Sequence, residues 1–402
     1  MGFILLTQYY PPEPGAASIR LRAMAWELTR LGHSVRVVTA LPHHLGAQGE
    51  GPQRFWKQER DGEIPVLRTW IWRVRTGRFW RRLLNYFSFV VTSFFGLWRM
   101  GRADYLVVES PPLFLGITAY AYSRLRGMPY ILSVSDLWPE SAVALGLVRN
   151  RLLIAITRRL ELFLYRKAAY VSAVTEGIRQ AVIQTGAIAP ERVLFFPNGV
   201  DLDLFEGGDG DRLRARLGLS DRHVFLYPGT LGYAQGLEVI LDAAELLQES
   251  LPQAVFLLVG EGPVKRSMME EAERRGLRNV LFEPLRPVQE MRHYLAMARA
   301  VVVPLRRHPL FAGARPSKVF PAWAAAVPVI FVGEGEMARL VEDSMAGVVV
   351  PPEDGGALAM AVEFLSRLSD WEWQAMGQAG RRYVERHYRW QAIAQAWLRG
   401  IQ

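Results

Sequence analysis

Short apolar runs rich in β-branched and aromatic residues alternate with amphipathic stretches along this chain, and the alternation occurs in two separate series. The first series has an apolar run at 3–10, a turn rich in Pro and Gly, a helical pattern at 18–31 and the run SVRVVTA at 34–40. Further apolar runs follow at 105–109, 130–134, 170–174 and 193–196. Parallel strands joined by helices need those helices on the sheet faces, so the first half predicts a parallel α/β domain.

The second series begins with VFLYPGT at 224–230, after a Gly- and Asp-rich stretch, GGDGD, at 207–211. It continues through VFLLVGEG, NVLFEPL, AVVVPL, PVIFV and GVVVPP. A chain of 402 residues is too long for one hydrophobic core. We therefore expect two Rossmann-like doubly wound domains, at 1–205 and 206–380, with a helix at 381–402 that can cross back to the first domain.

Composition narrows the classes of function. The absence of cysteine excludes disulfides, thiolate zinc sites and a cysteine nucleophile, and fits a reducing compartment. The amino terminus lacks the pattern of a secretory signal, so a cytoplasmic location is expected. The net charge of +9 favours phosphates, nucleic acid or acidic lipid. Because no nucleic-acid-binding pattern accompanies this charge, nucleic acid is not an expected partner.

One stretch, at 68–102, departs from the α/β pattern. It contains no acidic residue, and arginines flank an uncharged run of sixteen residues at 83–98. That run is shorter than the roughly twenty residues that span a bilayer, but it suits the plane of an anionic membrane surface. The residues expected there are Arg78, Trp80, Arg81, Arg82 and Trp98. The alternative is a buried core helix of the first domain.

Three turns that join an apolar run to a helix contain glycine and predict phosphate binding. Gly15 lies in YYPPEPGAAS, Gly229 and Gly232 lie in PGTLGYAQG, and Glu261 and Gly262 lie in VGEGPV. Such turns lie at the carboxyl edge of a parallel sheet, where backbone N–H groups at helix starts attract anions. None of them is a GxGxxG fingerprint.

Two further segments carry candidate side chains. In ARPSKVF, Pro316 and Ser317 read as a helix start, with Arg315 and Lys318 as cations where acids are preferred, which suggests an anionic ligand or two solvated basic residues. In SVSDLWPES, Asp136 follows an apolar run and either orients a substrate hydroxyl or caps the next helix. Metal-binding patterns are missing, and His43-His44 reads as an ordinary polar loop.

Taken together, these segments resemble the GT4 family of retaining glycosyltransferases with the GT-B fold, in which the two domains face each other across a cleft. The likeness is greatest to the branch that builds bacterial exopolysaccharide and O-antigen repeat units, of the colanic-acid and N-acetyl-fucosaminyl-transferase type. It covers nearly the whole chain. The most specific pieces are DLWPES, NGVD, GTLGYAQGLE and PLFAGARPSK, which stand in the family's order.

The resemblance implies transfer of a sugar from a UDP-sugar substrate, with no cofactor and no catalytic metal. It places Gly15, Gly229, Thr230 and Gly232 at the donor phosphates, with Gln235, Arg315 and Ser317 nearby, and Glu261 and Gly262 at the nucleoside. Lys318 would stabilise the departing diphosphate, and Asp136 would lie near the acceptor or the reacting sugar. The acceptor in this branch is commonly a polyprenyl-diphosphate-linked sugar at the inner face of the cytoplasmic membrane, where the enzyme would be peripheral.

The sequence also departs from the family pattern. The paired glutamates that close the donor site are replaced by Gly313 and Pro321, and the usual Gly-Lys before the next strand is Ala326-Val327. The Arg and Lys common after the first strand of the second domain are Thr230 and Gln235. Two hypotheses remain at this point: an active glycosyltransferase, or a non-catalytic homologue that binds a nucleotide-sugar or a partner in a polysaccharide assembly complex.

Overall fold

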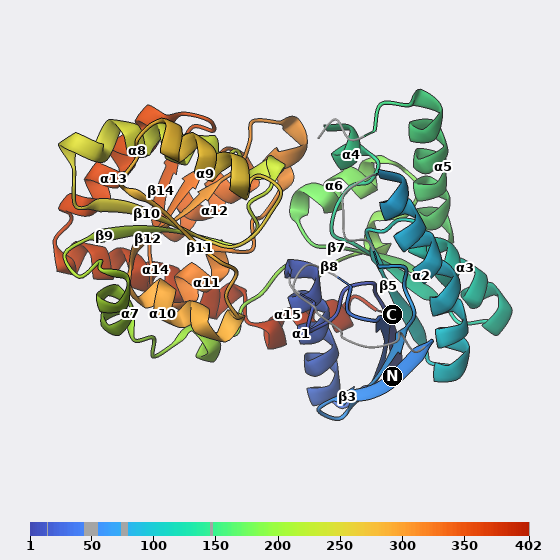
Figure 1. The fold of residues 1–402 in the computed structure, drawn as a ribbon. Coiled ribbons are helices and arrows are strands. Elements are labelled where there is room, and N and C mark those ends of the chain that lie inside the picture. The colour runs from blue at the N-terminus through green and yellow to red at the C-terminus, as the bar shows by residue number, and fades with distance from the viewer. Residues whose placement is uncertain (14, 44–54, 74–78, 145–147, 402) are drawn as a thin grey trace. The chain divides into compact units, whose positions relative to one another are not determined.

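The computed structural model describes the chain except for residues 14, 44–54, 74–78, 145–147 and 402, and gives only the backbone at 79–83 and 144. The chain folds into two compact units, drawn in Figure 1. Unit 1 comprises 1–198 and 390–402, and unit 2 comprises 199–389.

Unit 1 contains an eight-stranded sheet with the order β3-β4-β2-β1-β5-β6-β7-β8. All neighbours are parallel except the β3–β4 hairpin at one edge. The strands are β1 (Gly2–Leu6), β2 (Ser34–Ala40), β3 (Trp56–Asp61), β4 (Ile64–Thr69), β5 (Tyr105–Ser110), β6 (Tyr130–Val134), β7 (Tyr170–Ala173) and β8 (Val193–Phe195).

Helices cover both faces of this sheet. One face carries α2 (Phe79–Met100), α3 (Leu115–Arg126), α5 (Arg151–Lys167) and α6 (Glu176–Gln184). The other carries α1 (Ala16–Arg30) and α15 (Trp390–Arg399). Alternate residues of β1 serve the two faces: Ile4 and Leu6 pack with the first set, and Phe3 and Leu5 with the second. Successive strand side chains point to opposite faces, so a strand covered on both sides must be apolar throughout.

Unit 2 repeats the design with six parallel strands in the order β11-β10-β9-β12-β13-β14. They are β9 (His223–Pro228), β10 (Ala254–Val259), β11 (Val280–Glu283), β12 (Ala298–Pro304), β13 (Val329–Val332) and β14 (Gly347–Val350). One face carries α8 (Glu238–Ser250), α9 (Lys265–Arg274) and α13 (Gly355–Arg367). The other carries α7 (Gly210–Leu217), α10 (Met291–Ala296), α11 (Val319–Ala324), α12 (Glu336–Ser344) and α14 (Asp370–His387).

The strand order of each sheet locates its ligand edge. In unit 1 the chain adds β2 on one side of β1 and β5 on the other, and in unit 2 it adds β10 and β12 on opposite sides of β9. Ligands of doubly wound sheets bind at the carboxyl ends of the strands where the direction of addition reverses. A ligand site is therefore expected at the residues that follow β1 and β5 in unit 1, and at those that follow β9 and β12 in unit 2.

The observed division of the chain differs from the expected one. Unit 2 begins at Gly199 rather than at 206, because 200–205 already pack with its core, and α14 belongs to unit 2 through residue 387. Only the segment from Trp390 onwards belongs to unit 1. The β3–β4 hairpin was not expected, since the charged run WKQERD lacks an apolar alternation.

Candidate active site

The switch point of unit 2 is formed by closely packed glycine turns. Gly229, directly after β9, has φ +123°, and a Cβ atom there would lie 3.5 Å from Lys318 Cε. A Cβ on Gly260 would overlap the carbonyl oxygen of Gly229, and one on Gly262 would overlap that of Leu231. Glycine is needed at these positions because side chains would push the two turns apart. The structure thus brings Gly229, Lys318 and the 260–262 turn together.

Lys318 is the central cation of this edge. It immediately precedes α11, and its ammonium donates to the Tyr227 hydroxyl at 2.8 Å and lies 4.0 Å from the centre of the Tyr227 ring. The Tyr227 hydroxyl in turn donates to the carbonyl of Thr230 at 2.6 Å. Among the described residues, no carboxylate forms an ion pair with Lys318. Burial without a counter-charge lowers the pKa of Lys318 to about 7.

Arg315, expected at the donor phosphates, has other partners. Its guanidinium forms an ion pair with Glu336, and Nη1 donates to the Tyr388 hydroxyl at 3.2 Å. Both Arg315 and Glu336 are largely buried, with side-chain exposures of 11% and 8%. Ser317 is partly exposed in the turn between Arg315 and Lys318. The two cations of this segment therefore differ. Arg315 is paired with Glu336, whereas Lys318 has no acidic partner among the described residues.

The expected helix start at Pro316 and Ser317 is wrong by two residues, because α11 begins at Val319. Pro321 is consequently the third helical residue, neither in the interior nor at the first position. The first four N–H groups of a helix have no intrahelical acceptor, so proline costs no hydrogen bond there. Pro321 is compatible with the fold, and it leaves the site without the usual carboxylate.

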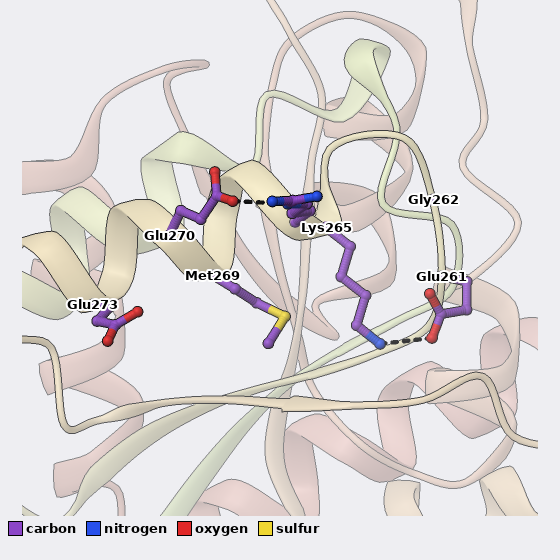
Figure 2. A pocket seen from close by; sticks show the side chains of 7 residues that line it. Glu261, Gly262, Lys265, Met269, Glu270 and Glu273 are labelled. Carbon is purple, nitrogen blue, oxygen red and sulfur yellow. Dashed lines mark hydrogen bonds and ion pairs between the residues drawn. The ribbon is translucent and has the colours of Figure 1, made fainter. Parts of the chain in front are cut away.

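The expected nucleoside residues line a pocket of about 380 Å³ (Figure 2). It is lined by Glu261 and Gly262 in the turn after β10 and by residues of α9 that include Met269. Lys265 donates to Glu261 Oε1 at 2.7 Å and to the carbonyl oxygens of Gly260 and Glu283, at 2.9 and 3.0 Å. This lysine ties together the ends of β10 and β11, and so shapes the pocket instead of offering a free charge.

The remaining donor candidates lie in the turn after β9. Thr230 is exposed, whereas Gly232 and Gln235 are partly exposed. This turn is held by Arg306, which donates to the Tyr233 carbonyl at 2.7 Å and to Glu238 at 2.9 Å. Arg306 follows β12, the partner strand at the switch point, and was missed because an arginine in a polar loop gives no periodic signal.

Unit 1 presents carboxyl groups at its carboxyl edge. Asp136 follows β6 and is partly exposed, and it accepts hydrogen bonds from Ser141 and from the N–H of Leu137. Burial outweighs these bonds and raises the pKa of Asp136 to about 6. Through Ser141, Asp136 is bonded to the first turn of the short helix α4 (Glu140–Ala144), and its own side chain stays partly exposed.

A buried polar network beside Asp136 escaped the sequence reasoning. Arg20 of α1 forms an ion pair with Glu109 of β5, and the side chains are 2% and 1% exposed. Ser135 donates to Glu109 at 2.6 Å, and Arg20 donates to Asn198, the last residue before unit 2, at 3.2 Å. Helix α1, strand β5, the turn after β6 and the end of the first segment of unit 1 thus meet at one buried ion pair. Residues this far apart in sequence carry no local signal of their pairing.

His43 lies in a loop, as expected, but its side chain is not solvated, and His44 lies outside the described residues. The His43 side chain is 6% exposed and pairs with buried Glu13, with Nδ1 3.2 Å from Oε1. Gln8, after β1, lies 3.1 Å from His43 Nε2 and donates to Asn85 of α2 at 2.8 Å. These side chains link the turns after β1 and β2. Gly15, the N-cap of α1, has φ +121° and is exposed, with open space where a Cβ would lie.

The structure bears out the core-helix alternative for one side of α2 in the segment 68–102, and it does not test the membrane alternative. One side of α2 is buried, with Phe89 and Leu97 fully enclosed, and the opposite side exposes an apolar stripe. The stripe consists of Leu84, Phe87, Val91, Phe95 and Trp98, which are 41–58% exposed. Arg78 lies outside the described residues, and for Trp80, Arg81 and Arg82 only the helical backbone is described. Arg68, in contrast, is buried and paired with Glu59 at 2.6 Å, so it does not belong to the surface.

Within the described ranges, no helix combines the length and the apolar character that crossing a bilayer requires. The described residues also contain no cluster of three or more His, Asp or Glu side chains that could hold a metal ion.

Two doubly wound units, one of which holds the partly buried Lys318 ammonium beside glycine turns at its switch point, are typical of two-domain α/β proteins that bind ligands at their sheet edges. Comparisons with known proteins narrow this class. The model of the glycosyl transferase 4-like domain matches residues 15–199, and that of glycosyl transferases group 1 matches residues 222–367. Together these matches span most of the chain, which belongs to the GT4-type glycosyltransferases.

Individual relatives agree with this family. The chain is 29% identical over 367 residues to the Escherichia coli (strain K12) protein named as colanic acid biosynthesis glycosyl transferase WcaI, covering 88% of this chain and 89% of the relative. The fold of this chain is similar to that of sucrose-phosphate synthase from Thermosynechococcus elongatus, with TM-score 0.76 and 20% identity. The similarity covers 98% of this chain and 97% of the synthase. HepE of Anabaena, solved with UDP and glucose, gives TM-score 0.74 at 18% identity, with the same coverage. The fold is therefore GT-B.

Proposed function

We propose that this glycosyltransferase moves a sugar from a UDP-sugar to a polyprenyl-diphosphate-linked or saccharide acceptor, with retention of anomeric configuration, in bacterial cell-surface polysaccharide synthesis. The observation that carries the proposal is the Lys318 ammonium beside Gly229, which lacks an acidic partner among the described residues. A preorganised cation in a poorly hydrated site stabilises the charge that develops on a departing diphosphate. The UDP complex of HepE and the name of the WcaI relative support the donor and the pathway class.

On the acceptor side, the proposal assigns Asp136 to the hydroxyl that attacks the donor sugar. A carboxyl group with a pKa of about 6 is largely ionised near neutral pH and can still accept a proton. The Arg20–Glu109 pair and Ser135 hold the preceding backbone, so the carboxyl group is attached to a well-ordered loop. Fixed geometry of this kind makes attack by a bound hydroxyl efficient.

We also propose that an exposed surface of unit 1 rests on the anionic inner face of the cytoplasmic membrane. The apolar stripe of α2 is continued by exposed Ile117 and Leu125 of α3 and by exposed Leu152 and Ile156 of α5. Cations border it: Arg126 lies 3.8 Å above the ring of Trp98, and Arg99 lies 4.7 Å above Trp56. Apolar side chains rimmed by arginine match the hydrocarbon and the phosphate layers of such a surface.

The decisive test is a transfer assay with the purified full chain, a panel of UDP-sugars and a polyprenyl-diphosphate-linked sugar in anionic vesicles. We expect release of UDP together with a glycosylated lipid, and NMR of the product should show the anomeric configuration of the donor. UDP binding by calorimetry without turnover across the panel would refute the proposed reaction and favour the non-catalytic homologue.

Pro321→Glu examines the donor wall itself. Pro321 is partly exposed in the first turn of α11, where a carboxylate is favoured by the helix dipole. If the missing carboxylate weakens ribose binding by about 1–3 kcal/mol, the variant should bind UDP roughly 5- to 150-fold more tightly. If the negative charge of the new glutamate causes the tighter binding, Pro321→Gln should bind UDP no more tightly than the wild type. Equal gains in UDP affinity for Pro321→Glu and Pro321→Gln would contradict a role for that charge.

A further inference from the structure

The two connections of unit 2 to the rest of the chain meet at one point. The chain enters unit 2 at Gly199 and leaves it at Arg389. The Val200 N–H donates to the Tyr388 carbonyl at 2.9 Å, and Val200 forms a parallel β-bridge with Arg389. The entering and leaving segments are therefore joined to each other, and Tyr388 lies at their junction.

The side chain of Tyr388 reaches from this junction to the turn that carries Lys318. Its hydroxyl accepts the 3.2 Å hydrogen bond from Arg315, three residues before Lys318. Its ring lies 4.5 Å from that of Phe320, two residues after Lys318. Tyr388 is only 6% exposed. One buried residue thus contacts both flanks of the Lys318 turn.

The Arg315 end of this arrangement is anchored a second time. Arg315 pairs with Glu336, the first residue of α12, in a largely buried environment. Removing one member of a buried ion pair leaves an uncompensated charge, so such a pair is held strongly in place. Tyr388 and Glu336 together fix the guanidinium, and the guanidinium fixes the backbone that leads to Lys318.

We propose that Tyr388 is a positioning residue for Lys318, acting through Arg315 and Phe320, and that it ties the diphosphate-binding turn to the two chain connections of unit 2. This inference rests on the proposed function, since it takes Lys318 as the group that meets the diphosphate. It assigns Arg315 to the support of Lys318 and not to direct contact with the donor. A displacement of about 1 Å in a positioned group can cost on the order of 100-fold in rate, so a residue holding Lys318 in place matters to catalysis.

The test uses two Tyr→Phe variants in the same helix region. Tyr388→Phe keeps the ring against Phe320 and removes the hydroxyl that Arg315 binds. Tyr383→Phe is the matched control: Tyr383 is partly exposed and packs on Trp323 of α11 at 5.6 Å, and its hydroxyl has no hydrogen bond within the described part of the chain. We expect Tyr388→Phe to weaken UDP binding and to lower kcat by about tenfold each, and Tyr383→Phe to change both by less than about twofold.

Three further measurements separate positioning from general stability. The Tm values of the two variants should agree, and Arg315→Lys should lower kcat less in Tyr388→Phe than in the wild type, because both changes affect the same Arg315–Tyr388 hydrogen bond. The decline of UDP affinity with rising pH should also shift in Tyr388→Phe but not in Tyr383→Phe, because only the first alters the surroundings of Lys318. Equal UDP affinities and equal kcat in the two Tyr→Phe variants would overturn the inference. If the wild type binds UDP but transfers no sugar, the proposed function alone is refuted. The UDP affinities of Tyr388→Phe and Tyr383→Phe would still test whether Tyr388 positions Lys318.

Discussion

The carboxyl edges of the two sheets share their strand–turn–helix construction and differ in what they present. Unit 2 presents the Lys318 ammonium between closely packed glycine turns, and unit 1 presents the Asp136 carboxyl beside a buried ion pair. Burial acts on both groups in the direction of the neutral form, lowering the pKa of the lysine and raising that of the aspartic acid. Under the proposed function, one architecture provides an anion site in unit 2 and a hydroxyl-orienting site in unit 1.

Lys318→Ala should have the largest effect, because it removes the only cation placed beside Gly229 among the groups we describe. Loss of one preorganised charge-stabilising group costs about 10²–10³ in rate, and UDP affinity should fall as well. Steady-state release of UDP and calorimetry measure the two effects. Arg367→Ala is the control, since Arg367 is 76% exposed on α13 and does not line the pocket at Glu261 and Gly262. Unchanged transfer by Lys318→Ala would remove the role assigned to unit 2.

Asp136→Asn should lower kcat by on the order of 100-fold, the lower range for a positioned acid or base. UDP affinity should stay within about twofold of wild type, because the change lies in unit 1. This pattern distinguishes the two edges: Lys318→Ala affects UDP binding and turnover, and Asp136→Asn affects turnover alone. A parallel loss of UDP affinity in Asp136→Asn would mean that the division of roles between the units is wrong.

The two pKa shifts predict opposite pH limbs. Asp136 must be ionised to accept a proton, so activity should rise as pH increases through about 6. Lys318 must be protonated to bind the diphosphate, so kcat/KM and UDP affinity should fall as pH increases through about 7. Beyond each pKa the loss approaches about tenfold per pH unit. Asp136→Asn should abolish the acid limb of the kcat/KM profile, and a profile whose acid limb survives in this variant would assign that limb to another group.

Membrane binding by the two units can be compared at two equally exposed phenylalanines. Phe95 on α2 and Phe364 on α13 are both 50% exposed. Phe95→Glu should reduce sedimentation with anionic vesicles by about tenfold, since it removes roughly 1–2 kcal/mol of apolar contact and adds a repelled charge. Phe364→Glu, in unit 2, should leave sedimentation unchanged. Equal losses, or none in either variant, would count against a membrane surface on unit 1.

Much of the fold could be predicted because its signals are local. The run SVRVVTA coincides with β2, and the turns at Gly15 and Gly229 lie where apolar runs give way to helices. Lys318 also stood out locally, as a cation where acids are preferred. The exposed and buried sides of α2 could not be separated in this way, because phenylalanine occurs on both: Phe89 is enclosed and Phe87 is 44% exposed.

The sequence by itself determined two doubly wound units, the positions of the glycine turns and the family, because apolar periodicity and motif order are written along the chain. Only the tertiary structure decided which charged groups are paired. Arg315 with Glu336, Arg20 with Glu109, and the contact of Tyr388 with the Lys318 turn all join residues more than twenty positions apart. Two equally charged side chains, Arg315 and Lys318, have different roles because burial and partners, set by packing between distant elements, decide which charge remains available to a ligand.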